Sequence, residues 1–278
     1  MATCGEARAR ATDTLRRAGA PTPALDADLL LAHVLGLPNE TLVAHPEFEL
    51  TSDEEERFDV LIVKRADGAP VAYLRGFKEF YGLRFAVDPR VLVPRPETEV
   101  LVEAVRSYAG GRALTVVDVG TGSGAIAIAL VVSDPNLRLI ATDVSAAALA
   151  VARTNAAAHG AQIDFRKGDL LGPITERVDV VAANLPYLRD DAFEQLAGDR
   201  TSLAFEPRVA TAAGQDGLAL VRHAIGDLAR VLAPDGAAFF ECDPPQVDEV
   251  AALLSALGPT GVIRDLAGLD RVVRVRRG

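Results

Sequence analysis

The residues best suited to chemistry are the four that follow the apolar run Val180–Ala183: Asn184, Leu185, Pro186 and Tyr187. A short apolar run that leads into a turn residue and a proline is typical of a buried strand that ends at Asn184. Pro186 restricts Leu185 to an extended conformation and has no backbone donor. The strand tip would therefore present one carboxamide, free backbone carbonyls and an aromatic face. Such groups can hold a planar substrate that carries an NH2 group.

A second motif is a glycine-rich turn between an expected strand and an expected helix: Gly120, Thr121, Gly122, Ser123 and Gly124. This unit holds nucleotides in doubly wound sheets, because glycines allow positive φ and close backbone approach and the helix N-terminus offers free N–H groups. An acid, Asp118, stands before the turn. The spacing Asp-x-Gly-x-Gly-x-Gly differs from the dinucleotide pattern Gly-x-Gly-x-x-Gly. An acid at this place would repel a pyrophosphate but suit a ligand with a positive amino group.

Two further acids stand at the ends of the next expected strands. Asp143 follows the strand expected at 137–142, about 20 residues after the glycine turn, which suits an acid that accepts hydrogen bonds from ribose hydroxyls. Asp169 and Leu170 follow the short strand expected at 163–165. In this order the carboxylate could meet an adenine amino group, and the leucine could pack on the ring.

The elements that must position these residues alternate between strand and helix. Alternation of this kind predicts a doubly wound, mainly parallel sheet of the α/β class, and a final hairpin around 267–270 adds one antiparallel strand. The polar stretch 189–208 is expected to be a loop that forms a substrate wall over the strand tips. Seven strands are expected, at 114–119, 137–142, 163–165, 178–183, 237–241, 261–266 and 271–275.

Three parts of the chain differ in character. Residues 1–70 carry leucines and alanines at helical spacing and predict a small N-terminal helical domain without a catalytic constellation. Residues 71–93 alternate at strand spacing, with strands at 71–74 and 83–87, and predict a β-hairpin linker. Residues 94–278 form the predicted catalytic domain. The helical domain could dock a partner, or it could be a lid or a stability element.

Composition narrows the partners and the location. The chain has 278 residues and a net charge of −10, which disfavours a broad nucleic-acid surface because such binding rests on clustered Lys and Arg. Neither the two cysteines nor the four histidines have metal-ligand spacing, so no metal is expected. No apolar run reaches the length of a membrane span, and the N-terminus lacks an apolar signal region. A cytoplasmic protein without a membrane partner is expected.

Taken together, the motif from Asp118 to Gly124, then Asp143, Asp169 and the Asn184 motif, resemble a class I S-adenosylmethionine-dependent methyltransferase that methylates amino groups. Three segments are similar to the family that methylates a glutamine in bacterial peptide chain release factors, and the N-terminal region and 70–73 also fit it, so the resemblance spans nearly the whole chain. The family usually has Asn-Pro-Pro-Tyr, whereas Leu185 stands second here and keeps the backbone carbonyl. The three segments are 94–99 (Pro-Arg-Pro-Glu-Thr-Glu), 206–208 (Glu-Pro-Arg) and 265–268 (Asp-Leu-Ala-Gly).

The resemblance implies a Rossmann-like fold and methyl transfer from S-adenosyl-L-methionine to the N5 nitrogen of the glutamine in a Gly-Gly-Gln motif, with S-adenosyl-L-homocysteine as product. It implies that release factors are the protein substrates and that the enzyme modulates translation termination. A monomer is expected, although the sequence itself does not give the oligomeric state. The glycine turn would wrap the methionine part of the cofactor, Asp143 would bind the ribose, and Asp169 with Leu170 the adenine; Asn184 would also belong to the cofactor site. The same resemblance assigns catalysis and substrate binding to Asn184, Leu185, Pro186 and Tyr187.

Three other functions remain open at this point. A paralogue could methylate a glutamine of a ribosomal protein. An adenine-N6 methyltransferase acting on DNA or RNA uses the same strand-tip chemistry, although the net charge and the lack of a basic, aromatic recognition domain argue against it. A non-catalytic nucleotide-binding or RNA-associated module is disfavoured because the strand-tip motif is intact.

Overall fold

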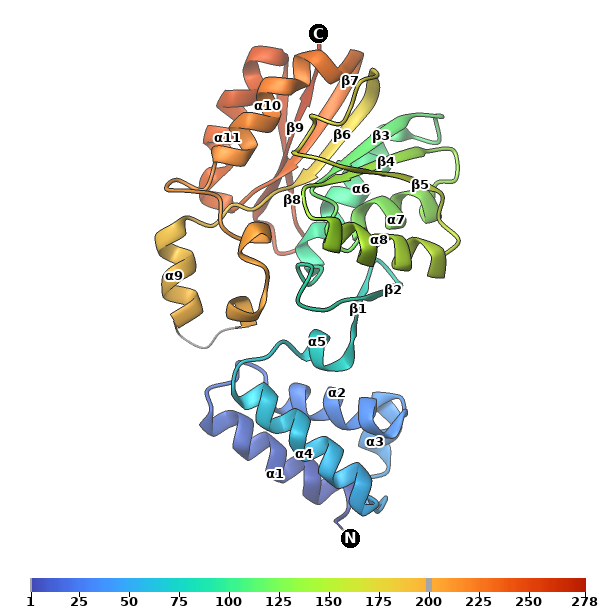
Figure 1. The fold of residues 1–278 in the computed structure, drawn as a ribbon, viewed down its shortest axis with the longest axis vertical. Coiled ribbons are helices and arrows are strands. Elements are labelled where there is room, and N and C mark those ends of the chain that lie inside the picture. Colours follow the sequence, from blue (N-terminus) through green and yellow to red (C-terminus); the bar gives the residue numbers. More distant parts are fainter. Residues whose placement is uncertain (1, 199–201) are drawn as a thin grey trace. The chain divides into compact units, whose positions relative to one another are not determined.

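The computed structural model describes residues 2–198 and 202–278. The chain forms two compact units, which are described separately (Figure 1). The helical unit consists of Met1–Phe77 with Gln195–Phe205, and the sheet unit consists of Lys78–Glu194 with Glu206–Gly278. The described residues 195–198 and 202–205 therefore cluster with the N-terminal helices, although they are far from them in sequence.

Capping and a small apolar core explain the helical unit. Thr3 and Thr51 each form a capping box with the glutamate three residues later, which satisfies free N–H groups at the start of a helix. The buried face of the helices is apolar and includes Leu15, Leu30 and Phe58. The helices of this unit are α1 (Cys4–Arg17), α2 (Pro23–Leu35), α3 (Asn39–Ala44), α4 (Ser52–Ala66) and α5 (Val71–Arg75).

A buried ion pair joins α2 to α4. The Arg65 Nε donates to Asp26 Oδ2 at 2.7 Å, and both side chains are at most 7% exposed. A second nitrogen of Arg65 donates to the carbonyls of Gly68 and Ala69, at the turn after α4, and the Thr22 hydroxyl donates to the other oxygen of Asp26. The pair is thus hydrogen-bonded on both sides, as a buried charge pair must be.

The predicted hairpin is wrong in its first strand. Residues 71–74 lie in α5, because Pro70 begins a helical turn in which its carbonyl accepts the N–H groups of Tyr73 and Leu74. The hairpin instead joins β1 (Phe77–Phe80) to β2 (Leu83–Ala86). Tyr81 and Gly82, with φ of 52° and 72°, form the tight turn that two-residue hairpins prefer. Alternation in a short run did not distinguish a strand from one helical turn.

The seven-stranded, mainly parallel sheet confirms the predicted fold class. Its order is β5-β4-β3-β6-β7-β9-β8, and among these described strands β9 runs opposite in direction to the other six. The chain first adds β4 and β5 on one side of β3 and then adds β6 and β7 on the other side. The end of β3 is therefore a switch point, where such sheets bind ligands. The strands are β3 (Thr115–Val119), β4 (Arg138–Asp143), β5 (Ile163–Lys167), β6 (Val178–Asn184), β7 (Leu232–Glu241), β8 (Thr260–Arg264) and β9 (Asp270–Arg276).

Helices cover both faces of this sheet (Figure 1). Side chains alternate along β3: Val117 and Val119 pack in the cluster that includes α10 and α11, whereas Val116 packs with α6 and α7. This alternation gives the sheet two apolar cores, as parallel strands buried on both faces require. The helices are α6 (Glu99–Ala109), α7 (Ala125–Ser133), α8 (Ala146–Ala158), α10 (Ala219–Val231) and α11 (Val247–Leu254).

The stretch 189–208 is not the irregular loop that its polarity predicted. It contains the helix α9 (Asp190–Gly198) and the short 3-10 helix η2 (Ser202–Phe205), while η3 (Arg208–Ala210) begins at its end. Two aspartates in the first turn of α9 favour a helix start, and Phe193 gives the helix a buried side chain. Residues 199–201 of this stretch lie outside the described residues.

Candidate active site

A cavity of about 470 Å3 opens at the C-terminal ends of β3, β4 and β6. Most of the residues singled out from the sequence line it, and all of the lining belongs to the sheet unit. Thr121, Ser123, Gly124 and Tyr187 do not line it. The predicted residues that do are Gly120, Gly122, Asp143, Asp169, Leu170, Asn184, Leu185 and Pro186.

Asp143 connects the glycine turn to the end of β4. Its two carboxylate oxygens accept the N–H groups of Gly122 at 2.9 Å and Ser145 at 2.8 Å. A carboxylate has about four acceptor positions, so further donors can still bind on the cavity side. Burial raises the pKa of Asp143, and the two backbone hydrogen bonds oppose that rise. The carboxylate is therefore held in place as an acceptor for hydroxyl groups.

Asp118 has a different role from the one its position suggested. The side chain is fully buried, and its Oδ2 accepts the Thr121 hydroxyl at 2.6 Å and the Ala127 N–H at 3.3 Å. Since Asp118 does not line the cavity, contact with a ligand's amino group is not its role. Burial raises the pKa of Asp118 to about 7. Asp118 thus supports the glycine turn through its contacts with Thr121 and Ala127.

The remaining turn residues also make contacts within the fold. Thr121 and Ser123 are at most 6% exposed, and the Ser123 carbonyl accepts the Asn155 amide at 2.9 Å. Gly124 has a φ of +84°, and a Cβ there would lie 2.9 Å from the Cδ1 of Ile128. Glycine at this position lets α7 begin close to its neighbours.

Asp169 and Leu170 follow β5 and line the cavity. Leu170 is mostly buried and adopts a φ of +43°, which a leucine rarely does. Backbone strain of this kind gathers at ligand sites. The exposed carboxylate of Asp169 lies 3.6 Å from the ring of His223.

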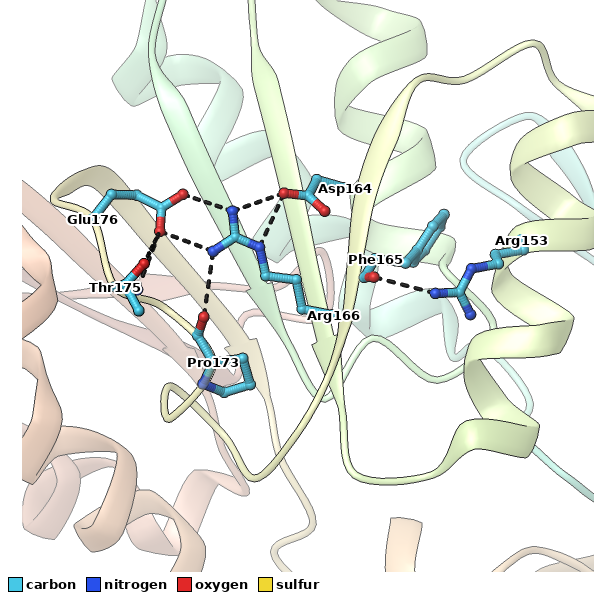
Figure 2. Close-up of polar contacts among 7 residues, drawn as sticks. All are labelled: Arg153, Asp164, Phe165, Arg166, Pro173, Thr175 and Glu176. Atoms are coloured by element: carbon cyan, nitrogen blue, oxygen red, sulfur yellow. Dashed lines mark hydrogen bonds and ion pairs between the residues drawn. The ribbon is translucent and has the colours of Figure 1, made fainter.

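A charge cluster holds the loop that carries these two residues. Figure 2 shows the guanidinium of Arg166, on β5, between the carboxylates of Asp164 and Glu176. Two nitrogens of Arg166 bind both oxygens of Glu176, at 2.6 and 2.8 Å. This contact lowers the pKa of Glu176 to about 2. Bidentate pairs fix geometry as well as charge, so the return of the loop toward β6 is anchored.

The carboxamide of Asn184 has a defined set of neighbours. Its Nδ2 donates to the Thr98 hydroxyl at 2.9 Å, and that hydroxyl contacts Glu241 Oε1 at 3.1 Å. Glu241 ends β7 and is the strand partner of Asn184. Within the part of the chain that the structure describes, no donor binds the Asn184 Oδ1 or the Leu185 carbonyl. Two acceptors are thus available at the strand tip.

Tyr187 lies just beyond this tip. Its carbonyl accepts the Gln246 side-chain amide at 3.1 Å, and a Cβ on Gly217 would lie only 2.2 Å from the same carbonyl oxygen. Burial, together with the charge of Glu241, raises the pKa of the phenol. The phenol therefore stays protonated over the neutral range.

The proline-rich segment and the Glu-Pro-Arg segment meet through an ion pair. Arg95 donates to Glu206 at 2.6 Å, and the side chain of Glu206 is fully buried. Burial raises the pKa of Glu206, which Arg95 opposes. The segment 94–99 also supplies Thr98, at the end of the 3-10 helix η1 (Pro96–Thr98).

Sequence reasoning missed the role of Thr98 and about half of the cavity lining. Thr98 lay inside a flagged motif, but no residue pattern predicted its contact with Asn184. The apolar part of the missed lining comes from the stretch assigned to a linker, from the start of α8, from η3 and from the first turn of α10, where small and apolar residues carry no chemical signal. The missed lining residues are Arg90, Val91, Leu92, Val144, Ser145, Ala148, Val209, Ala210 and Leu220.

Among the described residues, no group of three or more His, Cys, Asp or Glu side chains could hold a metal ion. No helix in the described ranges has the length and apolar character needed to cross a membrane. Both cysteines, Cys4 and Cys242, are buried free thiols.

The chain matches two family models and several curated relatives. Residues 6–76 match the family model "PrmC N-terminal domain", and residues 96–201 match "Methyltransferase small domain". A release factor glutamine methyltransferase from Koribacter versatilis is 38% identical over 95% of this chain and 94% of its own length. One from Deinococcus radiodurans is 38% identical over 96% of both.

Among solved structures, the T. Thermophilus 16S rRNA N2 G1207 methyltransferase, in complex with AdoMet and guanosine, has a TM-score of 0.53. It is 15% identical and covers 73% of this chain and 50% of that chain, so it supports the fold alone. The identity to the curated relatives extends over both units of the chain. The chain belongs to the release factor glutamine methyltransferase family.

Proposed function

We propose that the protein transfers a methyl group from S-adenosyl-L-methionine to the side-chain amide nitrogen of a glutamine in a peptide chain release factor. The observation that carries the proposal is the pair of free acceptors at the tip of β6, the Asn184 Oδ1 and the Leu185 carbonyl, beside the cavity. A primary carboxamide offers two N–H donors in one plane. Two neighbouring acceptors match those donors.

The cavity residues fit the cofactor. A volume of about 470 Å3 is in the range of small-molecule sites. The Asp143 carboxylate, held by Gly122 and Ser145, keeps acceptor capacity for ribose hydroxyls. Leu170 offers an apolar surface for the adenine ring, next to the carboxylate of Asp169. When bound, S-adenosylmethionine supplies a methyl group on a positively charged sulfur that is a good leaving group.

The strand tip orients a poor nucleophile. The nitrogen lone pair of a carboxamide is delocalised into its carbonyl. Acceptors that hold the two N–H groups direct the nitrogen and favour its pyramidal form, in which the lone pair is free to attack. Tyr187, three residues after Asn184, would pack against the amide plane. The proton leaves the nitrogen after transfer, so no strong base is required.

The decisive experiment combines an Asn184→Ala variant with a choice of substrates. The variant is expected to lose at least about 100-fold in methyl transfer while it keeps cofactor affinity, because one of two acceptors is removed. Labelled cofactor would be offered with a release factor, a ribosomal protein or plasmid DNA. Labelling of the release factor at glutamine supports the proposal. Labelling of the ribosomal protein or of adenine instead would overturn it, and full activity of Asn184→Ala would refute the mechanism.

The helical unit is proposed to dock the protein substrate. Val60 and Val63 on α4 are 48% and 61% exposed and line a shallow groove within this unit. Exposed apolar side chains grouped on one helix face are typical of a contact surface. A Val60→Asp, Val63→Asp double variant is expected to raise KM for the release factor without changing cofactor affinity. Val43→Asp, at an exposed valine of α3, serves as control. A stability element would instead show a lower melting temperature and an unchanged KM.

We also propose that the protein acts as a monomer in the cytoplasm, where release factors function. Size-exclusion chromatography with light scattering would test the oligomeric state. A stable dimer at assay concentration would contradict it.

A further inference from the structure

The carboxamide of Asn184 is linked to a buried carboxylate through one hydroxyl group. Asn184 Nδ2 lies 2.9 Å from the Thr98 hydroxyl oxygen, which lies 3.1 Å from Glu241 Oε1. Thr98 is 5% exposed and Glu241 is 3% exposed. The second carboxylate oxygen of Glu241 is buried and has no partner among the described residues. The hydroxyl is thus the carboxylate's contact on the side of the strand tip.

The protons in this chain of contacts determine its direction. A threonine hydroxyl has a single proton and two lone pairs, and an ionised carboxylate can only accept. When Glu241 is ionised, the Thr98 proton points to Glu241. The hydroxyl lone pairs then accept an N–H from Asn184. This arrangement turns the Asn184 Oδ1 away from Thr98, toward the place of the substrate amide.

Protonation of Glu241 permits the reverse arrangement. A protonated carboxyl group can donate to the Thr98 oxygen, which frees the Thr98 proton to bind the Asn184 Oδ1. The carboxamide would then be flipped, and its NH2 group would face the substrate. Because a glutamine amide presents N–H donors at this point, donor would meet donor and the substrate nitrogen would lose its orientation.

We propose that Thr98 and Glu241 are positioning residues that select the orientation of the Asn184 carboxamide, and that the enzyme is competent only when Glu241 is ionised. This inference rests on the proposed function, since it concerns how the same strand tip receives a carboxamide. It makes the orientation of the substrate amide depend on pH, which the two acceptors alone would not do.

The surroundings of Glu241 bring its ionisation close to neutral pH. Burial raises the pKa of Glu241 to about 7, and the nearby charge of Glu97 adds to the rise. The Thr98 hydrogen bond and the positive charge of Arg271, on β9, oppose it. Arg271 is itself paired with Asp265 at 3.3 Å.

Two other titratable groups near Glu241 do not ionise in the same range. Burial raises the pKa of the Tyr187 phenol above its ordinary value. Burial, with the charge of Glu241, raises the pKa of the Cys242 thiol to about 12. Asp243 adds a negative charge that acts on both groups. Of Glu241, Tyr187 and Cys242, Glu241 is therefore the one whose charge changes around neutral pH.

Kinetics against pH test the proposal. Thr98→Val keeps the shape of the side chain but removes the hydroxyl, and it is expected to lower kcat about 10- to 100-fold, as small misplacements at a reacting centre do. KM for the cofactor should change little. Thr98→Ser is expected to recover most of the loss. Thr211→Val, at another buried threonine whose hydroxyl binds backbone carbonyls, is the matched control.

The pH profile separates a positioning role from a structural one. In the wild type, kcat should rise with an apparent pKa of about 7. Glu241→Gln and Thr98→Val should lose this acid limb. The proposal is overturned if the limb persists in Glu241→Gln or if Thr98→Val keeps wild-type kcat. A wild type that methylates no glutamine would instead refute the proposed function.

Nuclear magnetic resonance of the Asn184 side chain tests the proposal without any catalytic turnover. In nitrogen-15-labelled protein, the side-chain NH2 resonances of Asn184 should shift with the ionisation of Glu241. Glu241→Gln should show no such shift between pH 6 and pH 8, values chosen to bracket a pKa of about 7. Resonances of Asn184 that do not respond to pH in the wild type would overturn the inference.

Discussion

The buried Asp118 should make the protein less stable as pH rises, and Asp118→Asn should remove that effect. The carboxylate has no exposed surface, its Oδ2 accepts two hydrogen bonds, and its Oδ1 has no partner among the described residues. An asparagine Oδ1 can accept the same two bonds from Thr121 and Ala127. Its NH2 group would then stand where a protonated aspartate has its O–H. The variant is therefore a fixed copy of the protonated state.

The size of the effect follows from the pKa. Burial raises the pKa of Asp118 from 3.8 to about 7, a shift of about three units, and each unit corresponds to about 1.4 kcal/mol. Between these two values, the folded state keeps a proton that the unfolded state releases, so the free energy of unfolding falls as pH rises. The total is about 4 kcal/mol. It is fully lost above the folded pKa of about 7.

Urea unfolding of both proteins, followed by circular dichroism, gives the comparison. From about pH 5.5 to about pH 8.5, the stability of Asp118→Asn relative to the wild type should increase by about 2 kcal/mol. Glu241 titrates in both proteins and cancels in the difference. Asp191→Asn is the control: Arg189 lowers the pKa of that exposed carboxylate, so it stays ionised in the folded and the unfolded protein over this range and its stability difference should not change with pH. A difference that does not change with pH would refute the reasoning.

Three further predictions concern contacts that support the two units. Asp26→Ala should lower the free energy of unfolding by about 3–5 kcal/mol, because Arg65 is left buried and unpaired. In thermal unfolding, the double variant Asp26→Leu, Arg65→Met should recover most of the lost stability, because it replaces both charges with apolar side chains. Glu176→Gln should cost up to about 1 kcal/mol at neutral pH, and the difference should vanish as pH falls through 4.5 toward about 2, where wild-type Glu176 also loses its charge. Gly217→Ala should lower the free energy of unfolding by about 2 kcal/mol and should also lower kcat. The reason is that Gly217 has a φ of +75° and that a Cβ there would lie 2.2 Å from the Tyr187 carbonyl oxygen. An unchanged melting temperature would contradict this prediction.

The sheet could be predicted because four of the expected strands, 114–119, 137–142, 178–183 and 237–241, were mainly apolar runs that ended in, or were followed by, a glycine, an acid or an asparagine. Those ends are also the site, so Asp143 and Asn184 were identified together with the fold. The helical turn at 71–75 was mistaken for a strand because four residues of alternating character fit both structures. Helix α9 was missed because polarity alone does not separate a surface helix from a loop.

Contacts between distant segments are a different matter. The hydroxyl of Thr98 meets Asn184 across 86 positions of sequence, and Glu241 stands beside both only because β7 pairs with β6. No local pattern contains such a contact. Asp118 was misread for a related reason: the acid was visible, but whether it faced the cavity or the helix behind it depended on where α7 begins.

Leucine at position 185 shows how the site keeps its geometry without a second proline. Proline would limit the backbone by its ring. Leu185 is instead 3% exposed and belongs to the apolar cluster beneath the sheet, so packing limits its motion. Its Cδ2 lies 3.2 Å from the place where a Cβ of Gly120 would be, so Gly120 leaves the space that this side chain needs. The glycine turn and the substrate-facing tip are thereby packed against one another. Asn184 lies between this anchored residue and Thr98, which leaves its exposed oxygen as the group free to recognise a carboxamide.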